Sequence, residues 1–491
     1  MRLADLLARA GLDTAGAGEG EVTGFAIDHR KVAPGTIFGA FEGATVNGED
    51  FIRPAIAAGA IAVVARPQAR VEGALHITDV TPRRAFAHLA AGFFSPYPDT
   101  VVAVTGTNGK TSTVEMTRQI WRMAGERAAS IGTLGVTTPD GSVSTGLTTP
   151  DIVTFLANMA GLAREGVTHV AYEASSHGLD QYRGEGPRVS AAAFTNFSRD
   201  HLDYHGTMEA YFAAKMRLFT EVVAPGSPAI IHDAGDGSEW TARAIAAASE
   251  RGLDVRTVGE GGTFLKLIAR EPGQLGQVLQ IEHEGAVRKV NLPLIGAYQA
   301  ANALVSAGLA LATGVAAAAV FDALTRLQPV RGRLERAALN QAGAPAYVDY
   351  AHTPDALEAA IAALRPHVAP GGKLIVVFGA GGDRDAGKRP QMGEVAARAA
   401  DLAIVTDDNP RGEDPAAIRA AIMAGAGSNT RDIAGRRAAI AAAIGEAGPH
   451  DIVLIAGKGH EQGQIFGSGE NMRIEAFDDV EVARECAGGQ C

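Results

Sequence analysis

Short, almost wholly apolar runs recur along the chain, and most end in Gly, Asp or Ser before an alanine-rich stretch. Strands buried on both faces of a parallel sheet have this pattern, and the alanine-rich stretches favour crossover helices. The chain is therefore predicted to be α/β, with ligand-binding side chains at the carboxyl ends of parallel strands. The runs predicted as strands are 60–65, 101–106, 168–175, 373–380, 402–408 and 451–459.

Two breaks in this alternation suggest domain boundaries. They are "FFSPYPDT" (93–100) and "LQPVRGRLER" (327–336), each followed by a new predicted strand. A chain of 491 residues usually forms about three domains. We expect domains over 1–97, 98–331 and 332–491, with strands and loops in the polar stretch near 233–290.

Charge and hydropathy exclude several classes of protein. The net charge is −11 and no long basic run occurs, which argues against nucleic acid as a partner. The first residues lack the apolar core of a signal peptide, and no apolar run reaches about 18 residues. We therefore expect a cytoplasmic enzyme without membrane insertion, and we expect a monomer.

The stretch "VAVTGTNGKTSTVEM" predicts a phosphate-binding loop between a strand and a helix. Gly109, Lys110 and Thr111 match the end of a Walker A loop, but Val104 stands where that loop has its first glycine. Amides at the helix N-terminus and Lys110 would bind phosphate, and the Thr111 hydroxyl could ligate Mg²⁺. A plain glycine turn is the alternative. The loop alone does not separate a kinase, a GTPase or a ligase.

Acidic, imidazole and amine side chains follow in the same half of the chain. Glu173 ends the predicted strand 168–175, while "SRDHLDYHG" places His201 among other polar residues before a helix that carries Lys215. Each residue alone is as well explained as an ordinary solvated side chain. A phosphate-binding loop, however, needs an acid near its magnesium ion, usually from a neighbouring strand.

Four motifs together, "GTNGKTS", "YEASSHGL", "NFSRDHLDYHG…AK" and "DYAHTPDAL", resemble the ATP-dependent Mur ligases of peptidoglycan synthesis. The form of that family's loop accounts for Val104. The resemblance implies three domains: a UDP-binding N-terminal domain, a central P-loop domain with a parallel sheet, and a Rossmann-like C-terminal domain that binds the amino acid. It also implies ATP-dependent activation of a carboxylate as an acyl phosphate, followed by amide formation.

The resemblance assigns the reacting residues position by position. Lys110, Glu173, His201 and Lys215 are the implied catalytic residues. Mg²⁺ would be held by Thr111, Glu173, His201 and Lys215, with Lys215 carbamylated. ATP would contact Thr107, Asn108, Gly109, Lys110, Thr111, Ser112, Thr113, Asn302, Arg333 and Asp349.

The C-terminal motifs "GAGGDRDAGKRPQMG", "TDDNPRGEDP" and "AGKGHEQGQ" resemble those of members that add meso-diaminopimelate. The planar guanidinium of Arg411 could grip the second carboxylate that distinguishes diaminopimelate from lysine. Taken alone, "DNPR" favours a type I turn. The implied pocket consists of Arg384, Asp408, Asn409, Pro410, Arg411, Gly457 and Glu461.

The other implied substrate is UDP-MurNAc-L-Ala-D-Glu. Its candidate residues are Ile27, His29, Thr45, Thr148, Thr149, Ser175, Gln181 and Arg183. Thr149 before Pro150 could instead start a helix. The chain departs from the family pattern at His29, where serine is common, and at Gln299, where asparagine is frequent.

Three alternatives remain open from the sequence. A lysine-adding Mur ligase lacks the arginine of the "DNPR" motif. Folylpolyglutamate synthase has a related loop and metal lysine but no uridine-type first domain. A P-loop kinase, a different class of enzyme, has no need of the Lys215 helix or of this third domain.

Overall fold

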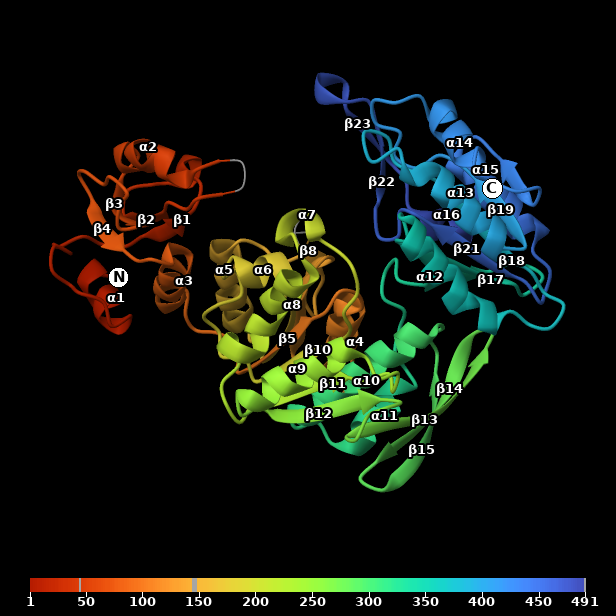
Figure 1. Cartoon of the computed structure of the whole chain (residues 1–491), viewed down its shortest axis with the longest axis horizontal. Coiled ribbons are helices and arrows are strands. Elements are labelled where there is room, and N and C mark those ends of the chain that lie inside the picture. The colour runs from red at the N-terminus through yellow and green to blue at the C-terminus, as the bar shows by residue number, and fades with distance from the viewer. Residues whose placement is uncertain (44–45, 144–147, 490–491) are drawn as a thin grey trace. The chain divides into compact units, whose positions relative to one another are not determined.

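The computed structural model describes residues 1–43, 46–143 and 148–489. The described chain forms two compact units, one of residues 1–258 with 305–317 and the other of residues 259–304 with 318–491. Among the described residues, no helix is long and apolar enough to cross a membrane. Figure 1 labels the elements in chain order.

The first unit begins with a small parallel sheet. Its four strands follow the order β1-β2-β3-β4 and pair in parallel throughout. The elements are α1 (Leu3–Arg9), β1 (Gly24–Ala26), β2 (Thr36–Gly39), α2 (Ile52–Ala57), β3 (Ala60–Ala65), β4 (Leu75–Thr78) and α3 (Pro82–Phe93).

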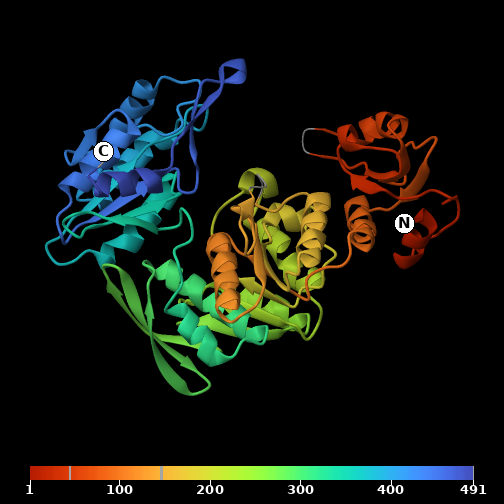
Figure 2. The ribbon, with the colours of Figure 1, turned by 180° about the vertical axis from the view of Figure 1, so that it is seen from behind.

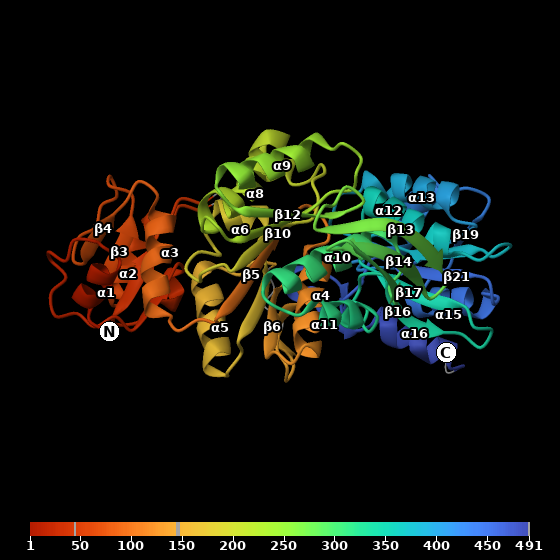
Figure 3. The same ribbon diagram turned by 90° about the horizontal axis from the view of Figure 1, so that it is seen from below.

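The same unit also contains eight consecutive strands of the 11-stranded sheet, in the order β12-β11-β10-β5-β9-β6-β7-β8. The first six are parallel, and β5, β6, β9 and β10 are buried almost throughout, which explains their continuous apolar runs. Figure 3 shows α8 and α9 on one side of this sheet and α4 and α5 on the other. The strands are β5 (Thr100–Thr105), β6 (Ala128–Gly132), β7 (Gly135–Thr137), β8 (Ser142–Val143), β9 (His169–Glu173), β10 (Ala191–Phe194), β11 (Pro228–His232) and β12 (Asp254–Gly259). The helices are α4 (Lys110–Met123), α5 (Ile152–Arg164), α6 (Ser176–Asp180), α7 (Leu202–His205), α8 (Met208–Arg217) and α9 (Glu239–Glu250).

Helix α9 corrects the expectation of strands and loops near 233–290. The strands β12 to β15 do lie there, but Glu239–Glu250 is helical. Ser238 caps the helix by accepting a hydrogen bond from Thr241 N, and its fully buried residues are Ala244 and Ala248, with Trp240 and Ile245 packed beside them. Alanine also occupies the exposed positions 242 and 246, so the apolar periodicity is weak and the sequence pattern missed the helix.

The second unit contains an antiparallel ribbon and a doubly wound sheet. The ribbon is β13 (Leu265–Gly273), β14 (Gly276–His283) and β15 (Ala286–Leu292). In the chain it is followed by α10 (Ala297–Ala312), whose residues from 305 onward belong to the first unit, and by α11 (Ala317–Leu324), which belongs to the second unit from residue 318. The sheet has the order β16-β17-β21-β18-β19-β20, parallel except for β16 at its edge. Its strands are β16 (Glu335–Leu339), β17 (Pro345–Asp349), β18 (Leu374–Phe378), β19 (Leu402–Val405), β20 (Thr430–Asp432) and β21 (Ile452–Ala456).

Helices cover both faces of this second sheet. One hydrophobic cluster joins the sheet to α12 (Pro354–Leu364), α13 (Lys388–Ala399) and α14 (Pro415–Met423), and another joins it to α15 (Arg436–Glu446) and α16 (Asp479–Ala487). The hairpin of β22 (Gly463–Phe466) and β23 (Arg473–Ala476) projects from the sheet, as Figures 1 and 2 show. The predicted α/β class with parallel sheets is confirmed.

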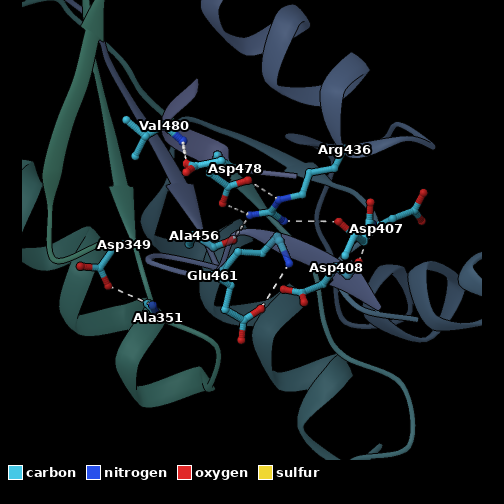
Figure 4. Close-up of polar contacts among 12 residues, drawn as sticks. Asp349, Ala351, Asp407, Asp408, Arg436, Ala456, Glu461, Asp478 and Val480 are labelled. Carbon is cyan, nitrogen blue, oxygen red and sulfur yellow. Dashed lines mark hydrogen bonds and ion pairs between the residues drawn. The ribbon is translucent and has the colours of Figure 1, made fainter. Parts of the chain in front are cut away.

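Arg436 anchors the last helix to the strand ends of this sheet. Its side chain is fully buried and donates to both carboxylate oxygens of Asp479, at 2.7 and 2.6 Å. It also donates to Ala456 O at 2.9 Å and Asp407 O at 3.3 Å, contacts drawn in Figure 4. Arg436 therefore ties α16 to the end of β21 and to the loop that follows β19.

Replacing Arg436 by methionine is expected to destabilise the second unit by about 3–5 kcal/mol, because Asp479 would keep an unpaired buried charge. Hydrogen–deuterium exchange of β19 and β21 measures this loss as faster exchange. The neighbouring Arg437→Met is the matched control, since Arg437 pairs with Glu485 at the surface and such pairs contribute about 0–1 kcal/mol. Equal protection in the two variants would contradict the prediction.

Candidate active site

The phosphate-binding loop connects β5 to α4. Gly109 has φ 86° and caps the helix, and Lys110 is the first helical residue. The Lys110 side chain turns back over its own loop and donates to Gly106 O at 3.0 Å and Thr107 O at 2.8 Å. A Cβ at Gly106 would lie 2.0 Å from Thr195 Oγ1, so only glycine fits there. Lys110 is thus placed where it can meet an anion at the helix N-terminus.

The segment after β10 holds this loop in place. Asn196 accepts hydrogen bonds from Thr107 N through its carbonyl and from Asn108 N through its side chain, both at 2.9 Å. Thr195 Oγ1 donates to Asn108 O at 2.6 Å. The motif "NFSRDHLDYHG" begins at Asn196, but sequence reasoning assigned neither Thr195 nor Asn196 a role. Ser112 and Thr113 are buried in the first turn of α4.

Oxygen atoms of four side chains gather at the start of α4. Thr133 Oγ1 lies 3.4 Å from Thr111 Oγ1, 3.3 Å from Glu173 Oε2 and 3.1 Å from Thr148 Oγ1, and Thr133 N donates to Glu173 Oε1 at 2.7 Å. Hydroxyl and carboxylate oxygens are the donors that Mg²⁺ prefers, so this group fits the ion. Thr133 was missed by sequence reasoning, although it follows β6, the strand beside β9.

Lys215 lies on α8 with only 1% of its surface exposed. Its Nζ donates to Gly106 O at 2.7 Å, the same carbonyl that Lys110 contacts, and lies 4.4 Å from the centre of the Tyr211 ring. Burial and the Lys110 ammonium hold the pKa of Lys215 well below its usual range, against the opposite effect of Asp200. The site therefore favours the neutral amine, the form that reacts with CO₂.

His201 lies near the Tyr211 ring. It has φ 50° and precedes α7, and its ring centre is 6.0 Å from that of Tyr211 and 4.9 Å from that of His177. Within the described residues, no three His, Cys, Asp or Glu side chains form a metal-binding group. Thr133 thus links Thr111 to Glu173, Lys110 and Lys215 share the carbonyl of Gly106, and the Tyr211 ring lies near both Lys215 and His201.

Five of the residues predicted for the UDP-linked substrate form one group beside Glu173. Thr149 Oγ1 donates to Glu173 O at 2.8 Å and lies 2.9 Å from Ser175 Oγ. Arg183 donates to Thr149 O at 3.1 Å and to Gln181 Oε1 at 2.6 Å. Thr148 joins this group through Thr133. Thr149 does not start a helix, because α5 begins at Ile152 with Asp151 as its cap.

The remaining candidates for that substrate are Ile27, His29 and Thr45, near the N-terminal end of the chain. Ile27 is exposed, and the His29 ring stacks on that of Phe51 with centres 4.5 Å apart. Thr45 lies outside the described residues.

The nucleotide candidates of the second unit form a buried network. Gln299 donates to Arg333 O at 2.7 Å and accepts from Asn302 Nδ2 at 3.2 Å. The Asp349 carboxylate accepts from Leu334 N at 2.8 Å and from Ala351 N at 2.9 Å, the latter shown in Figure 4. Burial raises the pKa of Asp349, while Arg333 lowers it. Gln299, the departure from the family pattern, thus connects Asn302 to the Arg333 backbone.

The predicted diaminopimelate residues meet where β18, β19 and β21 end. The Arg411 guanidinium donates to Gly382 O at 2.9 Å, and Asn409 Nδ2 donates to Glu461 Oε2 at 2.8 Å. A Cβ at Gly457 would lie 2.6 Å from Asp408 Oδ2, and one at Gly382 would lie 1.9 Å from Pro410 O. Arg384 is exposed on the loop after β18. Figure 4 shows Asp408 and Glu461 close together at these strand ends.

Three family models match consecutive parts of the chain. They describe the Mur ligase family catalytic domain over residues 21–94, the Mur ligase middle domain over 104–310, and the glutamate ligase domain of Mur ligases over 332–459. The three-domain architecture is confirmed by these matches. The boundaries after residues 97 and 331 stay predictions.

Curated relatives match almost the whole chain. A UDP-N-acetylmuramoyl-L-alanyl-D-glutamate–2,6-diaminopimelate ligase of Zymomonas mobilis is 59% identical, with 94% of each chain covered. A protein of that name from Bradyrhizobium diazoefficiens is 52% identical, with 98% of each covered. A solved structure of such a ligase is 32% identical with a TM-score of 0.73, and covers 96% of this chain and 95% of its own. The chain belongs to the Mur ligase family.

Proposed function

We propose that the chain is an ATP-dependent ligase that adds meso-diaminopimelate to UDP-MurNAc-L-Ala-D-Glu. It would act as a monomer in the cytoplasmic synthesis of peptidoglycan precursors. The near-full-length relatives are named for this reaction. The observation that carries the proposal is the group of residues at the ends of β18, β19 and β21. There Gly382 O holds the Arg411 guanidinium and Asn409 Nδ2 holds the Glu461 carboxylate, which gives two opposite charges at one edge of the sheet.

The loop before α4 binds the triphosphate in this proposal. Residues 107–113 surround the phosphates, which are met by the backbone amides at the start of α4 and by the Lys110 ammonium. Lys110 neutralises charge on the phosphoryl group that is transferred. Asn302, Arg333 and Asp349 contact the nucleoside. Asn196 and Thr195 keep the loop rigid, so little reorganisation is needed when ATP arrives.

Thr111 and Glu173 would hold Mg²⁺ together with His201 and a carbamylated Lys215. When bound, the ion supplies positive charge that stabilises the transferring phosphoryl group. Carbamylation joins the Lys215 amine to CO₂ with loss of a proton. It converts a side chain that would repel a cation into one that offers anionic oxygen ligands, and it places a negative charge beside Lys110.

The two halves of the reaction then use different groups of residues. Ile27, His29 and Thr45 contact the UDP end of the first substrate. The group of Thr148, Thr149, Ser175, Gln181 and Arg183 orients the glutamyl carboxylate of this substrate. An oxygen of that carboxylate attacks the γ-phosphorus of ATP as ADP leaves. The amine of diaminopimelate attacks the acyl phosphate carbon, loses a proton and displaces inorganic phosphate. Arg384, Asp408 and Gly457 complete the amino-acid pocket with Asn409, Pro410, Arg411 and Glu461.

A panel of amines tests the proposal. The purified chain is mixed with ATP, Mg²⁺, UDP-MurNAc-L-Ala-D-Glu and one amine: meso-diaminopimelate, L-lysine or L-glutamate. We expect phosphate release and a linked product with meso-diaminopimelate, and loss of both in excess chelator. Preferred use of lysine would support a lysine-adding enzyme. Coupling of glutamate to a folate would support a folylpolyglutamate synthase, and ADP formation without an amine would support a kinase.

A further inference from the structure

Lys458 is a fully buried lysine between two loops of the amino-acid pocket. Its side chain has no exposed surface. Its Nζ donates to Asn409 Oδ1 at 3.0 Å, to Gly463 O at 2.6 Å and to Glu461 Oε2 at 3.2 Å. An ammonium has three N–H donors, and these three acceptors use all of them. Lys458 therefore has no donor left for a substrate, and its effect on the pocket is exerted through its neighbours.

The first of these neighbours is the Asn409 amide. Its Oδ1 accepts from Lys458 and also from Ile465 N at 3.0 Å. If the amide were flipped, its NH₂ group would face two N–H donors. The network therefore fixes Oδ1 toward Lys458 and Ile465 N. The NH₂ end is consequently directed at Glu461 Oε2, 2.8 Å away.

The second neighbour is the Glu461 carboxylate. Both hydrogen bonds described for it, from Lys458 and from Asn409, arrive at Oε2. The side chain keeps 32% of its surface exposed. Two donors on one oxygen restrain the rotation of the carboxylate, and Oε1 is left to accept from a ligand.

We infer that Lys458 is a positioning residue for the incoming diamino acid. Lys458 fixes the positions of the Asn409 and Glu461 side chains, and it thereby determines where Glu461 Oε1 contacts the ligand's ammonium group. The inference rests on the proposed function, because it takes that pocket as the amine site. A buried ion pair that served only the fold would give a different result, since its loss would affect every substrate alike.

The test compares Lys458→Met with wild type in full kinetic series for each substrate. Methionine has a similar length but no donor. We expect KM for meso-diaminopimelate to rise about 10- to 100-fold, the range found when a residue that orients a metal ligand is removed. KM for ATP and for the UDP-linked substrate should change by less than about twofold. Lys373→Met, at an exposed lysine of the same unit, is the matched control.

A double-mutant cycle shows whether Lys458 acts through Glu461. In a Glu461→Gln background, Lys458→Met should raise KM for the amine by less than about threefold, because the carboxylate it positions is already gone. Additive effects would overturn the inference, as would a parallel rise in KM for all three substrates. If Lys458→Met does not fold, Lys458→Gln takes its place, since it keeps donors for Asn409 and Gly463 without the charge.

Failure of the proposed function is visible separately, in the wild-type protein. If wild type prefers another amine in the panel, the proposed substrate is wrong. The cycle is then measured with that amine, whose ammonium group Glu461 would also face.

Discussion

Replacing Lys215 by alanine is expected to lower kcat by roughly 10³-fold, the upper end for loss of one group that stabilises charge in a transition state. The reason is that Lys110 and Lys215 both donate to Gly106 O, which places two amine groups side by side. Lys110 is needed at the phosphates, and a second cation beside it would oppose the binding of Mg²⁺. A carbamate on Lys215 removes that repulsion and adds oxygen ligands, whereas alanine can do neither.

Two measurements check this prediction. Turnover in saturating bicarbonate should stay low in Lys215→Ala, because no amine remains to react with CO₂. In protein equilibrated with ¹³C-bicarbonate, NMR should show a carbamate resonance in wild type and none in the variant. Lys289→Ala, at an exposed lysine, should match wild type in both. Near-normal turnover of Lys215→Ala would remove Lys215 from the mechanism, and a carbamate signal that survives in it would come from another amine.

The sequence predicted the strands well for a physical reason. Strands such as β5, β18 and β21 are buried on both faces, so each position along them must be apolar, and a turn follows where burial ends. The same rule located most of the candidate residues, since parallel strands present their carboxyl ends at one edge. Helix α9 was missed because alanine occupies exposed as well as buried positions along it, which leaves little hydrophobic contrast between its two faces.

The contacts between candidate residues could not be predicted from the sequence. Thr133 connects Thr111 to Glu173, yet it follows a short strand of small residues, "AASIG", that carries no motif of its own. Tyr211 precedes Lys215 by one helical turn, a spacing that places two side chains together but does not say that the ring covers the amine. Lys458 stood inside a recognised motif, and only its burial reveals that it bonds Asn409 and Glu461 rather than solvent.

Replacing Arg411 by alanine is expected to raise KM for meso-diaminopimelate on the order of 10²-fold and to leave KM for ATP nearly unchanged. Arg411 has φ 50°, and its backbone is fixed by hydrogen bonds from Arg411 N to Ile465 O at 3.0 Å and from Gly467 N to Arg411 O at 2.7 Å. One guanidinium nitrogen bonds Gly382 O, which orients the planar group. A guanidinium restrained in this way can pair with a carboxylate through two parallel hydrogen bonds.

The discrimination between two amines carries more information than the loss of affinity. Lysine lacks the second carboxylate, so it gains nothing from Arg411 and leaves the guanidinium unpaired. Arg411→Ala should therefore raise KM for meso-diaminopimelate far more than KM for lysine, and the preference for meso-diaminopimelate should fall by a similar factor. Arg411→Lys keeps the charge but not the planar fork, so its KM for meso-diaminopimelate should lie between those of wild type and Arg411→Ala. Arg398→Ala, at a surface pair with Glu358, is the control. If KM for lysine and for diaminopimelate rise in parallel, Arg411 supports the loop instead of gripping a carboxylate.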